Sequence, residues 1–101
     1  MKITFKIRTP GGVQVLTKEH EPRFVKFDKA PKWLRKYKFF THRSFAHSDD
    51  SWNLTEMSTG SAVVVGEPSA EDARDVGLAG MLRLGREKVD ATIFKILKED
   101  K

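Results

Sequence analysis

Apolar and polar residues alternate along the N-terminal part of the chain. Ile3, Phe5 and Ile7 each stand between polar neighbours, and this period of two is typical of a half-buried strand. Residues 13–18 repeat the alternation less regularly, after the break that Pro10-Gly11-Gly12 introduces. Proline and glycine in succession favour a turn, so the pattern predicts a β-hairpin.

Four further runs predict strands. The first two, residues 23–27 and 38–45, are short and contain most of the phenylalanines. The other two, residues 52–57 and 61–66, form the clearest hairpin of the chain, because a three-residue loop that ends at Gly60 separates them. Glycine readily adopts the positive φ that such loops require.

Three segments of this region carry more specific expectations. Residues 62–65 are uncharged and mostly β-branched, which is typical of a central strand. Residues 33–37 fit either a helical turn or an extended segment that leads into the next strand. Residues 46–51 are polar and predict a loop.

The last third of the chain changes to a helical pattern. Ser69 is followed three residues later by Asp72, which resembles a capping box in which Asp replaces the preferred Glu. Apolar residues then recur through residues 73–84, and Gly85 is placed to end or kink the helix. Val89 begins a second apolar stripe with helical spacing.

This second stripe leaves two alternatives open. Val89, Ile93 and Ile96 are β-branched and also fit a final strand, although their spacing favours a helix. Together with Leu82 they could form a dimer surface, but packing on the chain's own sheet is the favoured interpretation. Strands followed by helices predict an α+β fold: an antiparallel β-meander of about five to six strands, then one or two C-terminal helices packed on one face.

Composition restricts the class of protein. A length of 101 residues indicates a single domain, residues 1–101. The chain contains no cysteine, which excludes disulfides and zinc–thiolate sites and fits a reducing compartment. Its longest apolar run, residues 62–65, is far shorter than the roughly 20 residues of a membrane span. We therefore expect a soluble, cytoplasmic protein with no membrane partner.

The net charge of +5 hides a division along the chain. Residues 1–44 carry twelve Lys and Arg against three acids, whereas residues 45–101 carry seven against eleven. A basic surface is the usual electrostatic signature of a polyanionic partner. Scattered lysines that keep a sheet soluble would give the same count.

Residues 29–43 interleave cations with aromatic rings. Cations neutralise phosphates and rings stack on bases, so the segment indicates nucleic-acid binding. The alternative is that the rings belong to the core and the lysines protect a strand edge. The predicted partner-binding residues are Lys29, Lys32, Trp33, Arg35, Lys36, Tyr37, Lys38 and Arg43.

One cluster has the residue types for metal or acid–base chemistry. His42, His47, Asp49 and Asp50 lie close together in the sequence, and imidazole and carboxylate can share a divalent ion. The same residues also read as a turn, because Ser and Asp bond to nearby backbone amides. No catalytic or nucleotide-binding motif is present in the sequence, so we expect no enzyme activity, no metal and no cofactor.

The stretch from Phe39 onward resembles small proteins encoded by phages and other mobile elements. The resemblance rests on a Trp-x-x-Thr-Glu strand at Trp52–Glu56, the Thr59-Gly60 turn, the apolar run 62–66 and the capped helix from Ser69. It covers about half the chain. It implies an accessory gene product of unknown activity and transfers no catalytic residue.

Three hypotheses of function follow. The first is a non-enzymatic accessory protein that binds DNA, RNA or a nucleic-acid-handling complex through the basic N-terminal half. The second is a protein–protein interaction module, or an inhibitor of a host protein, that uses the same basic and aromatic residues for an acidic partner. The third is a small metal-dependent enzyme that uses His42, His47 and Asp49.

Overall fold

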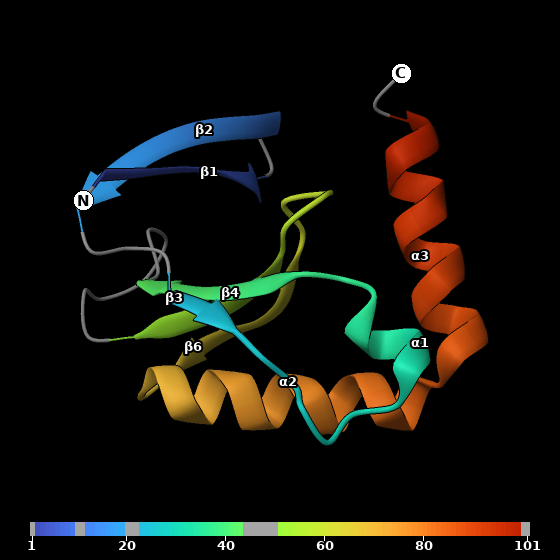
Figure 1. Cartoon of the computed structure of the whole chain (residues 1–101). Coiled ribbons are helices and arrows are strands. Elements are labelled where there is room, and N and C mark those ends of the chain that lie inside the picture. The colour runs from blue at the N-terminus through green and yellow to red at the C-terminus, as the bar shows by residue number, and fades with distance from the viewer. Residues whose placement is uncertain (1, 10–11, 20–22, 44–50, 100–101) are drawn as a thin grey trace.

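A β-hairpin, a four-stranded sheet and a long helix lie in three successive layers (Figure 1). The computed structural model describes residues 2–9, 12–19, 23–43 and 51–99. The elements of this part of the chain are β1 (Lys2–Thr9), β2 (Gly12–Glu19), β3 (Arg23–Val25), α1 (Lys32–Arg35), β4 (Phe39–Arg43), β5 (Trp52–Glu56), β6 (Ala62–Glu67), α2 (Ala70–Leu84) and α3 (Arg86–Glu99).

Every strand pairs antiparallel with a neighbour in the sequence. β1 pairs with β2, and the second sheet has the order β3-β4-β5-β6. The described residues therefore contain six strands, which confirms the predicted α+β class and strand number. The first hairpin is, however, a sheet of its own and does not continue into the meander.

The expectation of a central strand at residues 62–65 is wrong. β6 pairs only with β5 among the described strands and so lies at the edge of the sheet. Val65 is half exposed there, and Val63 and Val64 are partly buried. β-Branched residues favour extended backbone in any strand, so their propensity did not locate this one within the sheet.

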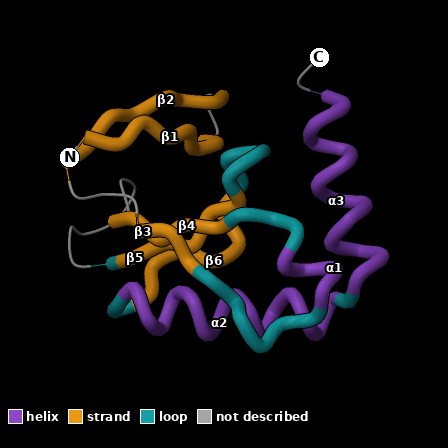
Figure 2. The backbone as a smooth tube through the Cα atoms, viewed as in Figure 1, coloured by secondary structure: helices purple, strands orange, loops and turns teal. Residues whose placement is uncertain are grey.

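β4 separates two groups of buried side chains, because successive residues of a strand point to opposite faces. Phe39 faces α2 and belongs to the larger core with Leu54, Ala73 and other residues. Phe40 faces the hairpin and packs with Phe5 and Ile7. Helices thus cover one face of the sheet, as predicted, and the hairpin covers the other (Figure 2).

Both side-chain and backbone contacts hold the hairpin against the sheet. The rings of Phe5 and Phe40 meet edge to face with centroids 5.3 Å apart. The Arg8 amide donates to the Gly60 carbonyl over 2.7 Å. Gly60 has φ +74°, and a Cβ there would lie 3.2 Å from the Lys6 carbonyl oxygen. The β5–β6 turn therefore requires glycine both for its conformation and for its contact with β1.

The buried carboxylate of Glu56 organises the same turn. It accepts hydrogen bonds from the Ser58 amide over 2.7 Å and from the Thr59 amide over 2.9 Å. The Ser58 hydroxyl donates to it as well. These contacts explain a charged side chain that is only 3% exposed, since a buried carboxylate needs several donors.

The helices begin and end where the sequence predicts. Ser69 is the N-cap of α2, and its hydroxyl accepts from the Asp72 amide over 3.0 Å. Gly85, with φ +87°, ends α2. The final segment is helix α3 and not a strand, and residues 33–37 begin within the short helix α1.

α2 lies very close to the sheet at one glycine. A Cβ on Gly77 would be 2.4 Å from a methyl carbon of Leu54, whereas a Cβ on Gly80 would meet nothing within 4 Å. α3 turns away from α2 and runs past α1 (Figure 2), and its Val89 and Ile93 are buried. The alternative of a dimer surface on this stripe stays a prediction.

Candidate functional site

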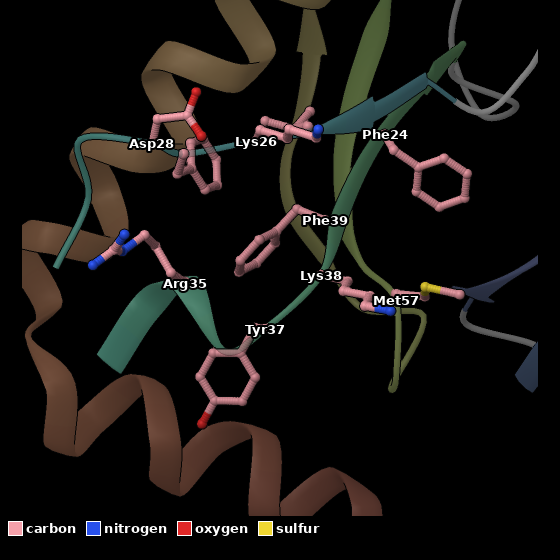
Figure 3. A pocket seen from close by; sticks show the side chains of 10 residues that line it. Phe24, Lys26, Asp28, Arg35, Tyr37, Lys38, Phe39 and Met57 are labelled. Carbon is pink, nitrogen blue, oxygen red and sulfur yellow. The ribbon is translucent and has the colours of Figure 1, made fainter. Parts of the chain in front are cut away.

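The segment between β3 and β4 encloses a pocket of about 530 Å³ (Figure 3). The chain leaves β3, forms α1 and returns to β4, so residues that are distant in sequence face one another. Most of the lining comes from this excursion, and one residue, Met57, directly follows β5. The lining residues are Phe24, Val25, Lys26, Phe27, Asp28, Arg35, Tyr37, Lys38, Phe39 and Met57.

Aromatic side chains form the floor of the pocket. The buried ring of Phe39 lies 5.4 Å from that of Phe27 and 6.5 Å from that of Tyr37, measured between centroids. In Figure 3 the Phe39 ring points into the space between the two arms of the segment. The floor thus offers apolar surface to a ligand.

Cations stand around the apolar floor. Lys26, Arg35 and Lys38 are exposed and line the pocket together with one carboxylate, that of Asp28. They belong to three different parts of the segment (Figure 3). The rim is therefore positively charged, and an anionic ligand with an apolar part is complementary to it.

A second hollow of about 290 Å³ continues the pocket toward the hairpin. The two share Phe24 and Met57, which are both exposed, and the hairpin contributes Lys6 and Val15 to the second hollow. We call the two hollows together the basic groove. It runs from α1 to the hairpin along β3.

Tyr37 fixes α1 to α3. Its hydroxyl donates a hydrogen bond to the carboxylate of Asp90, and the Lys36 ammonium lies 3.3 Å from the same carboxylate. The Arg86 guanidinium lies 3.6 Å from it. Burial is the main cause that raises the pKa of the Tyr37 phenol, and the bond to Asp90 raises it further. The bond from Tyr37 is also the main cause that lowers the pKa of Asp90.

These pKa changes give the contact a pH range. The pKa of Tyr37 is higher in the folded protein than in the unfolded chain. The contribution of Tyr37 to the free energy of unfolding is therefore complete below the ordinary tyrosine pKa, and it is lost as the pH rises through the raised value. The pKa of Asp90 is lower in the folded protein than in the unfolded chain. The contribution of Asp90 to the free energy of unfolding is therefore complete above the ordinary aspartate pKa, and it is lost as the pH falls through the lowered pKa. The α1–α3 contact is thus strongest across neutral pH.

The single tyrosine of the chain makes this contact directly measurable. We predict that the ultraviolet absorbance of tyrosinate, followed during a base titration, shows Tyr37 ionising well above its ordinary pKa of 10.0. Asp90→Asn should lower the pKa of Tyr37 but leave it above that value, because burial persists. Asp75→Asn is the control, since Asp75 pairs with Arg74 instead. An unchanged pKa in Asp90→Asn would contradict the contact.

Three of the predicted partner-binding residues line the pocket, and the other five do not. Arg35, Tyr37 and Lys38 line the pocket. Lys29 and Lys32 are exposed outside it. Lys36 pairs with Asp90.

Two further residues of that set lie elsewhere. Trp33 is half-buried and packs against the larger core. Arg43 stands over the ring of Trp52, 5.3 Å from its centroid, and Arg23 stands 4.9 Å from the same ring. Both arginines lie toward the end of β4 that is remote from Lys38.

Sequence reasoning missed most of the pocket, because seven of its ten lining residues are not among the predicted partner-binding residues. Phe24, Lys26 and Phe27 were assigned to a strand, Asp28 to a loop and Met57 to a hairpin, and none was linked to a site. The available signal was in residues 24–27, where apolar residues occupy both sides of a short strand. Of these residues, Phe24 is 57% exposed.

His42 has a structural role. It is 1% exposed, with Nδ1 3.0 Å from the Arg43 carbonyl oxygen and Nε2 2.8 Å from the Thr55 hydroxyl. Both ring nitrogens therefore have partners within the protein. His47, Asp49 and Asp50 lie outside the described residues, and the part of the chain that is described contains no cluster suited to a metal ion.

Comparison with known proteins gives no relative. No protein family, no curated protein and no solved structure matches the chain. Within residues 2–9, 12–19, 23–43 and 51–99, no helix has the length and apolar character needed to cross a membrane. The basic groove is therefore the feature from which a function can be proposed.

Proposed function

We propose that the protein is a non-enzymatic interaction module that docks an acidic segment of a partner protein in the basic groove. The observation that supports this proposal is the combination of an apolar floor with a rim of exposed cations. Lys26, Arg35 and Lys38 surround Phe27 and Phe39, and Asp28 is the one carboxylate in the lining of this pocket. Acidic residues around an apolar anchor would match both parts.

The state of the aromatic rings favours a polypeptide over a nucleic acid. Base stacking requires rings with a free face. Trp33 packs against the core, the Lys36 ammonium lies over the Tyr37 ring, 5.0 Å from its centroid, and Phe39 and Phe40 are buried. Phe24 is the exposed ring of the groove. The nucleic-acid hypothesis stays a prediction, and the experiment below includes it as an outcome.

Binding of defined probes tests the proposal. The probes are a short fluorescent peptide in which Glu alternates with Val, the same peptide with Lys in place of Glu, and a single-stranded oligonucleotide. We expect anisotropy to report binding of the Glu peptide at low salt, weakening as salt is added, and no binding of the Lys peptide. Binding of the oligonucleotide alone would replace the proposal by the nucleic-acid hypothesis.

Charge reversal on the groove gives a sharper prediction. The double variant Arg35→Glu, Lys38→Glu should bind the Glu peptide about tenfold more weakly at low salt, because two attractive contacts become repulsive. The double variant Lys95→Glu, Lys98→Glu is the matched control, since it changes the net charge by the same amount and both lysines are exposed on α3, outside the groove. Equal losses in the control and in the groove variant would show that net charge, and not the groove, drives binding.

We also propose a cytoplasmic location and no cofactor. The lack of cysteine fits a reducing compartment. Both ring nitrogens of His42 are engaged within the fold, so it is poorly placed to serve the alternative metal-dependent enzyme.

A further inference from the structure

β3 has an open outer edge. It lies at the end of the sheet and pairs with β4, and no other described strand pairs with it (Figure 1). Its three residues, Arg23–Val25, are exposed or half-buried. An edge strand of this kind presents unpaired N–H and C=O groups, to which another extended chain can add.

The register shows which backbone groups are available. The Met57 amide donates to the Lys38 carbonyl over 2.8 Å, so by the alternation of an antiparallel ladder Phe40 also directs its N–H and C=O toward β5. Phe39 and Thr41 then direct theirs toward β3, where their partners are Val25 and Arg23. Phe24 lies between these partners, and its N–H and C=O consequently point away from the sheet.

Hollows on both faces of β3 would receive the side chains of an added strand. The basic groove follows β3 along its hairpin side and around its C-terminal end. On the helix side a further hollow of about 210 Å³ lies between β3 and the start of α2, lined by Arg23, Arg74 and Glu71 among others. Alternate side chains of an added strand point to opposite faces, so both sets would have room.

We infer that the acidic segment of the partner docks by adding to β3 as an additional strand of the four-stranded sheet. This inference rests on the proposed function and specifies how the partner is held. Main-chain bonds to Phe24 would align the segment, its carboxylates would meet Lys26, Arg35 and Lys38, and an apolar side chain would enter the pocket over Phe39.

The charges around β3 make the edge selective. Lysine side chains on an edge strand, and a short edge strand, both reduce unwanted pairing with other strands. Lys26 and Arg23 repel a basic strand and attract an acidic one. They also disfavour a second copy of this chain, because joining two β3 edges would bring the cations of both copies together.

Hydrogen exchange at the Phe24 amide tests strand addition. With the Glu–Val peptide at about 100 times its Kd, exchange at Phe24 should slow by roughly 100-fold, because only the free protein exposes that amide. The amides of Arg23 and Val25, which already face β4, serve as internal controls. Bound peptide with unchanged exchange at Phe24 would overturn strand addition and leave the acidic docking proposal intact.

Backbone substitutions provide a second, independent readout. Proline is tolerated on an edge strand when the missing N–H faces away from the sheet. Phe24→Pro should therefore bind the peptide roughly fivefold more weakly than Phe24→Ala, which loses the ring and keeps the amide. If Phe24→Pro fails to fold, a peptide N-methylated on every second residue replaces it. Two such peptides are compared, one methylated at the Glu residues and one at the Val residues. Only one of the two sets of amides faces β3, so one peptide should lose binding and the other should keep it.

The remaining outcomes separate this inference from the proposed function. If the peptide does not bind the unmodified protein at low salt, both the proposed function and the strand-addition inference are wrong. If light scattering shows a dimer whose Phe24 amide is protected without peptide, a second copy occupies the edge and strand addition by an acidic partner is overturned. If only the oligonucleotide protects the Phe24 amide, the groove binds nucleic acid and the inference also falls.

Discussion

Phe40→Ala should lower the free energy of unfolding by about 3–5 kcal/mol and detach the hairpin from the sheet. Phe40 is 1% exposed and joins the two layers through Phe5 and Ile7. Its ring also lies 5.5 Å from that of His42, between centroids. Removing it leaves a cavity at the centre of this contact. Because domains of this size are stable by only about 5–15 kcal/mol, the loss is a large part of the total.

Urea unfolding and hydrogen exchange measure this prediction. The unfolding midpoint should fall, and amides of β1 and β2 should lose more protection than those of β4 and β5. Phe24→Ala is the matched control, since Phe24 touches the same ring but is 57% exposed, and it should cost less than about 1 kcal/mol. A loss as small as the control's, with the hairpin still protected, would refute the role of Phe40.

Gly77→Val and Gly80→Ala should change stability in opposite directions, although both lie on α2. A Cβ on Gly77 would overlap a methyl group of Leu54, and Leu54 is fully buried, so a shift of its side chain disturbs the packing of the core. We expect Gly77→Val to destabilise the protein by roughly 2–3 kcal/mol. Gly80→Ala meets nothing within 4 Å, so it should stabilise the helix by up to about 1 kcal/mol.

Thermal unfolding of the two variants provides the comparison. The Tm of Gly77→Val should fall and that of Gly80→Ala should rise. Gly77→Ala should lie between them, because it adds the overlapping carbon but gains helix propensity. If both glycine variants were equally stabilised, α2 would not approach the sheet as closely as the Gly77–Leu54 distance indicates.

The parts of the fold that depend on residues close together in the sequence were predictable. The β5–β6 hairpin followed from alternation and Gly60, and the start of α2 followed from Ser69 and Asp72. The placement of strands was not predictable, because alternation defines which residues share a face and not which strand lies beside them. The separate first hairpin and the edge position of β6 depend on contacts between distant segments, such as that of Phe5 with Phe40.

The candidate site was predictable only along one stretch of chain. Three of the predicted partner-binding residues, Arg35, Tyr37 and Lys38, line the pocket, and their part in binding stays a prediction. Lys26 and Met57 could not be linked to them, because the return of the chain through α1 brings Lys26 near and the pairing of β4 with β5 brings Met57 near. Local composition also could not show that the Tyr37 hydroxyl is engaged by Asp90, which is remote in the sequence.

The nearest-neighbour strand order also bears on the order of folding events. Contacts between segments close in sequence form quickly, because little loop entropy is lost in making them. The meander from β3 to β6 needs only such contacts, whereas the Arg8–Gly60 and Phe5–Phe40 contacts close long loops. The hairpin should therefore dock after the rate-limiting transition state. Its side chains would then govern how fast the native protein unfolds more than how fast it forms.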